Sequence, residues 1–119
     1  MANHNDLGVL GEEIAVNFLL GKGYLIEALN WRTGHLEIDI IAHQNGILVF
    51  LEVKTRKNTK FGFPEANVTT KKEKLLFEAA ANYMYSVDYE QEFRFDIIAI
   101  TFAPELEIMH FEDAFFPNW

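Results

Sequence analysis

The sequence predicts an α/β fold in which helices pack against a mixed β-sheet. Three observations carry this prediction: a long helical segment precedes three strand-like segments, one of those strands is apolar over five consecutive residues, and a second helical segment precedes a last pair of strands. A continuously apolar strand is typical of a sheet that is covered on both faces. Helices and strands in this order favour a sheet with helices against it. With 119 residues, half of them hydrophobic, we expect one domain over residues 1–119.

The first helix is expected over residues 7–20, with Asp6 as its N-cap and Gly21 directly after its end. Apolar residues cover nearly every side of this segment, so we expect the helix to be largely buried. Glu12 and Glu13 interrupt the apolar surface. Helical periodicity alone does not decide which of the two glutamates faces the sheet.

Three strands are expected next, over residues 24–31, 36–40 and 47–51. Asn45-Gly46 has the composition of a tight hairpin turn, so the second and third strands should form an antiparallel pair. The third strand runs directly into Glu52-Val53-Lys54, which places charged side chains at the end of a central strand.

The second of these strands alternates strictly between apolar and acidic residues. Because every second side chain of a strand points to the same face, we expect Leu36, Ile38 and Ile40 on one face. Glu37 and Asp39 then share the opposite face.

Asp39, Glu52 and Lys54 are expected to converge, because Glu52 and Lys54 share a strand face and the hairpin brings Asp39 close to them. Buried charges are costly unless they are paired or bind a metal. The trio suits phosphodiester hydrolysis, in which a divalent cation held by one or two carboxylates polarises the phosphate and helps to deprotonate water. Lys54 would orient that water or offset developing charge. The alternative is a charged cluster or salt bridge without a catalytic role.

Magnesium or manganese is the expected cation, because both prefer oxygen ligands. Zinc is disfavoured, since the chain has no cysteine and its histidines show no paired spacing.

A second helix is expected over residues 68–87, followed by strands over residues 93–102 and 106–111. Lysines near the start of this helix break the usual preference for acids there, and an anionic ligand nearby is one explanation. Arg94 and Asp96 share a strand face, where an ion pair and a role near substrate are both open. The residues expected to point inward from the helix are Leu75, Leu76, Ala79, Ala80 and Tyr83.

The net charge of −8 argues at first sight against a nucleic-acid partner. Its distribution weakens that objection, because residues 54–74 contain seven basic and two acidic side chains, a net of +5, which leaves −13 for the rest. A solvated surface is the alternative explanation of such a charge run. The candidates for phosphate contacts are Arg56, Lys57, Lys71, Lys72 and Lys74.

The spacing of Asp39 from Glu52-Val53-Lys54 resembles the Asp...Glu-x-Lys signature of restriction-endonuclease-like nucleases. Nearly the whole chain is similar to the YraN-like family of bacterial proteins described as endonucleases by prediction, which itself is similar to archaeal Holliday junction resolvases. The segments that carry this resemblance are Gly8-x-x-Gly11-Glu12-x-x-Ala15, Gly23-Tyr24, Asn30-Trp31-Arg32, Glu37-Ile38-Asp39-Ile40-Ile41-Ala42, Val49-Phe50-Leu51-Glu52-Val53-Lys54-Thr55-Arg56, Arg94-Phe95-Asp96 and residues 110–115.

The resemblance implies a restriction-endonuclease-like core and a Mg²⁺- or Mn²⁺-dependent endonuclease that hydrolyses DNA, with branched or structured DNA as its substrate. It also implies that Glu12 is a further acid near the metal held by Asp39 and Glu52. Glu37 would either support these ligands or simply be exposed. A homodimer would be the natural way to cut both strands of a symmetrical junction.

Two other functions compete with this one. A nucleic-acid-binding or protein-interaction module that keeps the fold without turnover is favoured by the overall acidity. An enzyme acting on small phosphorylated molecules ranks last, because the chain lacks a glycine-rich phosphate loop. We expect a cytoplasmic protein without membrane contact, since the chain lacks cysteine, a secretory signal and any apolar run of about 20 residues.

Overall fold

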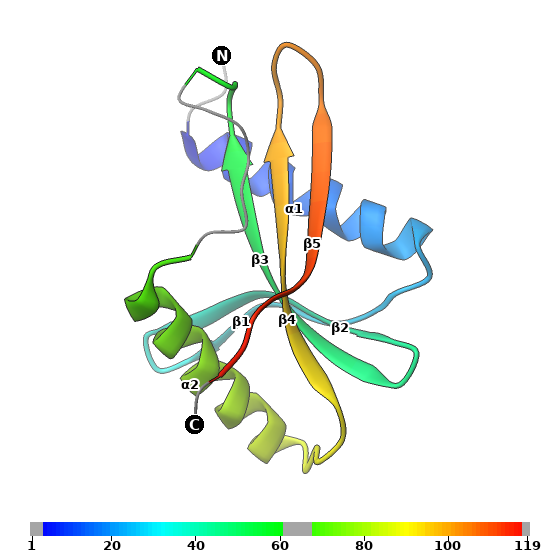
Figure 1. Cartoon of the computed structure of the whole chain (residues 1–119), viewed down its shortest axis with the longest axis vertical. Coiled ribbons are helices and arrows are strands. Elements are labelled where there is room, and N and C mark those ends of the chain that lie inside the picture. The colour runs from blue at the N-terminus through cyan, green and yellow to red at the C-terminus, as the bar shows by residue number, and fades with distance from the viewer. Residues whose placement is uncertain (1–3, 61–67, 118–119) are drawn as a thin grey trace.

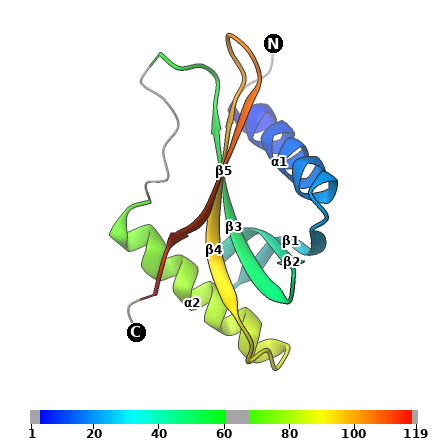
Figure 2. The same ribbon diagram turned by 45° about the vertical axis from the view of Figure 1, so that its right-hand side comes forward.

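The structure, a computed structural model, describes residues 4–60 and 68–117. Within these residues a five-stranded sheet in the order β1-β2-β3-β4-β5 lies between two helices, with α1 against one face and α2 against the other (Figures 1 and 2). Strands β3 and β4 run parallel and the other neighbouring pairs are antiparallel, so the fold is α/β with a mixed sheet, as predicted. The elements are α1 (His4–Gly21), β1 (Leu25–Thr33), β2 (Leu36–Gln44), β3 (Ile47–Arg56), α2 (Thr70–Ser86), β4 (Phe93–Thr101) and β5 (Glu107–Phe115).

The hairpin between β2 and β3 forms as predicted. Asn45 and Gly46 both have positive φ, of 52° and 79°. This is the backbone conformation that a two-residue turn needs in order to match the twist of the strands on either side. The parallel pair β3 and β4 needs a longer connection, and α2 lies between the two strands along the chain.

Helix α1 packs on the sheet along one stripe only. Gly11, Ala15 and Leu19 recur every four residues and are buried, whereas Val9 is 61% exposed and Leu20 is 52% exposed. The expectation of a largely buried helix was therefore wrong, because in the described part of the chain no third layer covers the outward side of α1 (Figure 2). The N-cap assignment was also wrong: α1 begins before Asp6, which lies in its first turn.

Strand β2 changes its facing direction at Asp39. Leu36 and Ile38 pack in the apolar cluster beneath α2, but Ile40 packs in the cluster beneath α1, so the predicted common face of the three was wrong. β2 pairs with β3 only from Ile40 to Gln44, whereas its pairing with β1 begins at Leu36. The residues of β2 before Ile40 therefore pair with β1 but not with β3. β2 changes its facing direction where its pairing with β3 ends, and a fork opens there between the two strands (Figure 1).

Helix α2 covers the other face largely as predicted. Four of the five residues expected to point inward are buried and Leu75 is half-buried. The helix begins after Thr69, whose hydroxyl oxygen accepts a hydrogen bond from the Lys72 backbone N–H at 3.2 Å. This cap fixes the first turn of α2 beside the fork. None of the described helices is both long and apolar enough to cross a membrane. The fold is consistent with a restriction-endonuclease-like core.

Candidate active site

Asp39 lies at the point where β2 and β3 separate. Its Oδ2 accepts a hydrogen bond of 2.8 Å from the backbone N–H of Val53, which lies two residues beyond Leu51, the last residue of β3 that pairs with β2. The carboxylate therefore joins the two strands across the start of the fork. Because this bond uses Oδ2, it leaves Oδ1 for a ligand.

Glu52 lies next to Asp39 across the fork. The antiparallel register ends at Ile40↔Leu51, so Asp39 and Glu52 each lie one residue beyond the last pair, and the charge of Asp39 acts on Glu52. Burial, and then the charge of Asp39, raise the pKa of Glu52 to about 7, against the opposing effect of Lys72 and Lys54. Burial likewise raises the pKa of Asp39, although the hydrogen bond from Val53 lowers it. The two ionised carboxylates are thus held together at a cost in free energy.

Two lysines approach this pair from different elements. Lys54 lies two residues after Glu52 on β3, and its charge favours the ionised form of Glu52. Lys72 comes from the first turn of α2 and places Nζ 3.6 Å from Oε1 of Glu52. The positive charge of Lys72 also lowers the pKa of Asp39. The predicted trio is therefore joined by a lysine that the sequence had indicated only as a candidate for phosphate contacts.

Helix α1 turns Glu12, rather than Glu13, toward the carboxylates. Glu12 is half-buried and Glu13 is exposed. Burial, followed by the charge of Asp39, raises the pKa of Glu12, and a hydrogen bond with the Asn30 side chain lowers it. Both glutamates line a hollow of about 330 Å³ between α1 and β1, whose other lining residues are Val9, Val16, Asn17, Leu29 and Asn30.

Glu37 lies at the edge of this acidic cluster. Its Oε2 is 3.1 Å from Nη2 of Arg32, and its side chain is 33% exposed. Its charge raises the pKa of both Asp39 and Glu12, which places it within electrostatic reach of the cluster. Arg32 and Glu37 are opposite each other in the pairing of β1 with β2, so this ion pair joins the two strands.

A hard divalent cation fits the donor set of Asp39 and Glu52. Both donors are carboxylate oxygens, and magnesium commonly keeps several waters while one or two carboxylates hold it. Within residues 4–60 and 68–117, no three His, Asp or Glu side chains gather closely enough to enclose a metal on their own. A cation between the two carboxylates would offset the negative charge of Asp39, which raises the pKa of Glu52.

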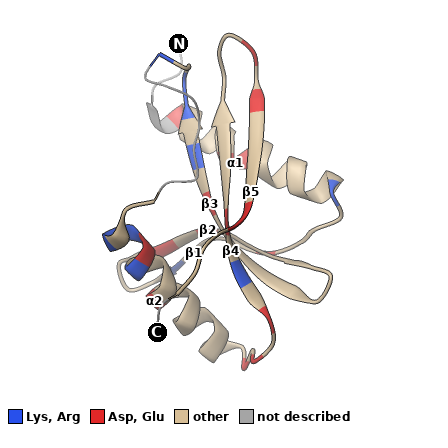
Figure 3. Cartoon of the chain, viewed as in Figure 1, with Lys and Arg blue, Asp and Glu red and all other residues tan. Residues whose placement is uncertain are grey.

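The other basic residues of the 54–74 segment lie outside the carboxylate cluster. Lys71 and Lys74 are exposed near the start of α2. Figure 3 shows basic segments on β3, on the chain after it and at the start of α2. The basic residues that follow Lys54 line a hollow of about 560 Å³, formed by Arg56, Lys57, Asn58 and Lys60.

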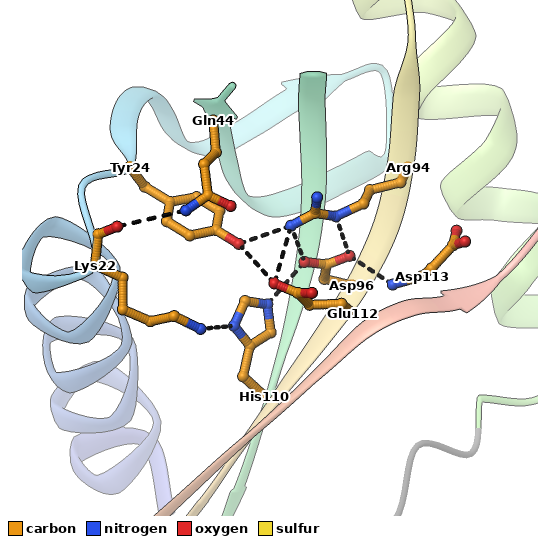
Figure 4. A network of polar contacts seen from close by, with 8 residues as sticks. All are labelled: Lys22, Tyr24, Gln44, Arg94, Asp96, His110, Glu112 and Asp113. Carbon is orange, nitrogen blue, oxygen red and sulfur yellow. Dashed lines mark hydrogen bonds and ion pairs between the residues drawn. The ribbon is translucent and has the colours of Figure 1, made fainter. Parts of the chain in front are cut away.

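A second polar cluster surrounds Asp96, which is fully buried on β4 (Figure 4). Arg94 Nε donates to Oδ1 of Asp96 at 3.0 Å, so the ion pair left open by the sequence is present. The backbone N–H of Asp113 also donates to Oδ1, at 2.9 Å, where the pairing of β4 with β5 shifts register. Asp96 thereby satisfies polar groups that this irregularity leaves unpaired.

His110 connects the Asp96 cluster to the end of α1. Its Nε2 lies 2.7 Å from Oδ2 of Asp96, and its Nδ1 lies 2.9 Å from Nζ of Lys22. The carboxylate accepts and the ammonium donates, so the ring carries its proton on Nε2. Burial alone would raise the pKa of Asp96, but hydrogen bonds from His110, Arg94 and the Asp113 backbone lower it below its usual range.

Some residues of these clusters could not be predicted from the sequence. The sequence gives no local signal for the contact of Asn30, which has a positive φ of 49°, with Glu12, or for the contact of His110 with Asp96. The contact of Lys72 with Glu52 did have a signal, namely the lysines at a helix N-terminus.

Comparison with known proteins gives one consistent result. The family model described as "Uncharacterised protein family UPF0102" matches residues 11–100. The chain is 50% identical to a UPF0102 protein of Flavobacterium psychrophilum, 45% to one of Bacteroides thetaiotaomicron and 37% to one of Dictyoglomus turgidum, with 98% of both chains covered in each comparison. The chain therefore belongs to the UPF0102 family, the YraN-like family that its motifs predicted.

Proposed function

We propose that this protein is a Mg²⁺- or Mn²⁺-dependent endonuclease that hydrolyses phosphodiester bonds of DNA. One observation carries the proposal: Asp39 and Glu52 lie together in the fork between β2 and β3, with raised pKa values and with Lys54 and Lys72 beside Glu52. Carboxyl groups whose pKa is shifted by burial together with a charged neighbour cluster at functional sites. The Asp...Glu-x-Lys resemblance supports the same function.

Each residue of the candidate site has a proposed role. Asp39 and Glu52 would hold the cation, and Asp39 is kept in place by its hydrogen bond to Val53. When bound, the cation supplies a Lewis acid for the phosphate and lowers the pKa of water. Lys54 would orient the attacking water or stabilise negative charge that develops on the phosphate. Glu12 would act from α1 as a further acid beside Asp39.

The basic segment supports a polyanionic substrate. The hollow at Arg56, Lys57 and Lys60 and the exposed lysines of α2 would contact phosphates on either side of the site. Branched DNA is proposed from the resemblance to junction resolvases. A homodimer is proposed on the same basis, because two sites would allow both strands of a junction to be cut.

The test is cleavage of linear, flapped and four-way DNA by the purified protein with Mg²⁺ or Mn²⁺, beside Asp39→Asn. Asn retains an oxygen that can accept from Val53 but loses the anionic ligand, so we expect cleavage to fall at least about a hundredfold. Glu13→Gln is the matched control, since it removes an exposed acid from the same region and should leave the rate unchanged.

Two results would count against the proposal. Cleavage by Asp39→Asn at the parental rate would remove Asp39 from the mechanism. The second result is a parent that binds DNA but cleaves no substrate with either Mg²⁺ or Mn²⁺. That result would identify a binding module that retains a nuclease fold.

A further inference from the structure

We propose that the ammonium of Lys72 takes the place of the divalent cation while none is bound, and moves to a phosphate of the substrate when the cation enters. This inference rests on the proposed function, because it assigns the site of Asp39 and Glu52 to a metal. It makes Lys72 a residue that links metal binding to substrate binding.

The position of Lys72 is that of a counter-ion shared by both carboxylates. Its Nζ lies 3.6 Å from Oε1 of Glu52, and its charge acts on Asp39 as well. Lys72 and the buried Leu76 are four residues apart, so they lie on the same, sheet-facing side of α2. The cap from Thr69 to the Lys72 backbone holds this turn in place. A single positive charge is thereby directed at the two acids.

The neighbouring lysines of α2 do not share this position. Residues 71 and 74 are displaced around the helix by about 100° and 200° from residue 72. The charge of Lys72 lowers the pKa of both Asp39 and Glu52, and its Nζ forms the ion pair with Glu52. Position, and not only local positive charge, therefore distinguishes Lys72.

The contact between Lys72 and Glu52 is one that a cation could displace. The Lys72 side chain is 45% exposed, and ion pairs this open to solvent contribute little to stability. A divalent cation would interact more strongly with both acids and would repel the ammonium. The displaced side chain would remain beside the site at the start of α2, where a phosphate of the substrate could take it as a partner.

This exchange predicts positive coupling between the binding of the divalent cation and the binding of the DNA phosphate. A phosphate that holds Lys72 away from Glu52 removes a competitor of the cation, and a bound cation releases Lys72 for the phosphate. Because coupling between two binding equilibria is reciprocal, each ligand should strengthen the binding of the other.

The first experiment is calorimetric titration with Mn²⁺ in the absence of DNA, for the parent and Lys72→Met. We expect the variant to bind Mn²⁺ roughly three- to tenfold more tightly, since it lacks the competing charge. Lys71→Met is the matched control for general charge, and Lys72→Arg restores the cation, so both should bind as the parent does. Equal or weaker binding by Lys72→Met would overturn the inference while leaving the proposed metal site intact. Absence of Mn²⁺ binding by the parent and every variant would overturn both.

The second experiment measures the affinity for a short DNA duplex with Ca²⁺ and with chelator. Ca²⁺ should increase the affinity of the parent by a larger factor than that of Lys72→Met, because only the parent has an ammonium to release. Lys71→Met should show the parental increase. Equal increases in parent and Lys72→Met would refute the transfer of Lys72 to a phosphate.

Discussion

Asp39 and Glu52 illustrate at the residue scale how a candidate site opposes the stability of the fold around it. Glu52 is only 17% exposed, and the pKa of about 7 reflects burial together with the charge of Asp39. A carboxyl group whose pKa is raised in the folded state favours folding while it is protonated. It loses that contribution as the pH rises through the folded pKa. At pH 8 the ionised Glu52 therefore destabilises the metal-free protein.

Replacing Glu52 by Gln should stabilise the metal-free protein at pH 8 by about 1–3 kcal/mol, because the amide carries no charge to desolvate. Chemical denaturation in the presence of a chelator measures the change. Mg²⁺ should then raise the melting temperature of the parent but not that of Glu52→Gln. A variant that is less stable than the parent would show that the ion pair with Lys72 outweighs the cost of burial.

Contact between α1 and β3 depends, at the element scale, on a single missing side chain. A methyl group at Gly11 would lie 2.4 Å from Oγ1 of Thr55, so the helix approaches the strand as closely as it does because residue 11 is glycine. This contact sets the distance between α1 and β3, and therefore how closely Glu12 approaches the carboxylates.

Gly11→Ala should destabilise the protein by about 1 kcal/mol net, since overpacking by about 1–3 kcal/mol exceeds the helix propensity gained from alanine. Gly8→Ala is the control, because nothing lies within 4 Å of a methyl group there and the same propensity gain should stabilise the protein. Denaturant unfolding of both variants distinguishes the two effects. Thr55→Ala should restore stability to Gly11→Ala if the contact, rather than the helix itself, is responsible.

The first turns of α2 provide a second prediction at the element scale. If Lys71, Lys72 and Lys74 bind phosphates, replacing all three by Gln should reduce the slope of log affinity against log salt by about 1 for each lysine that no longer binds one. Fluorescence anisotropy with labelled DNA at several salt concentrations gives the slope. Lys22→Gln is the control, because Lys22 follows the C-terminal end of α1 and lies outside α2. It should leave the slope unchanged. The same slope for parent and triple variant would move the DNA-binding surface away from α2.

The buried cluster around Asp96 acts on the scale of the whole molecule, because it joins segments that are far apart in the chain. Arg94 bridges Asp96 to Tyr24, with Nη2 2.7 Å from the Tyr24 hydroxyl, and His110 extends the cluster to Lys22. The connection between α1 and β1 and strands β4 and β5 thus share one charged centre (Figure 4).

Asp96→Asn should destabilise the protein at pH 7 by on the order of 3 kcal/mol, because the arginine beside it remains buried with only the exposed Glu112 as a charge partner. The pKa of Asp96 is lowered in the folded state, so its contribution is present above the unfolded value of about 3.9 and is lost as pH falls through the folded pKa. The difference in unfolding free energy between parent and variant should therefore shrink below about pH 4. A constant difference from pH 7 to pH 3 would mean that packing, and not charge, makes the cluster stabilising.

Local patterns in the sequence determined the elements and the centre of the candidate site. The Asn45-Gly46 turn, the apolar run of β3 and the two-residue spacing of Glu52 and Lys54 predicted a hairpin that ends in charged side chains. Turn chemistry and strand periodicity depend on neighbouring residues, so they can be read without knowledge of the fold. The same local patterns were sufficient to predict that Asp39 lies beside Glu52.

Only the tertiary structure decided how distant segments meet at that centre. It turned Glu12 rather than Glu13 toward Asp39, brought Lys72 to Glu52, and changed the facing direction of β2 at the fork. Periodicity defines the faces of a helix or strand relative to its own axis, but not which face the neighbouring elements will cover. That choice follows from packing between residues far apart in the chain, and it determined both the exposed outer side of α1 and the acids and lysines that surround the fork.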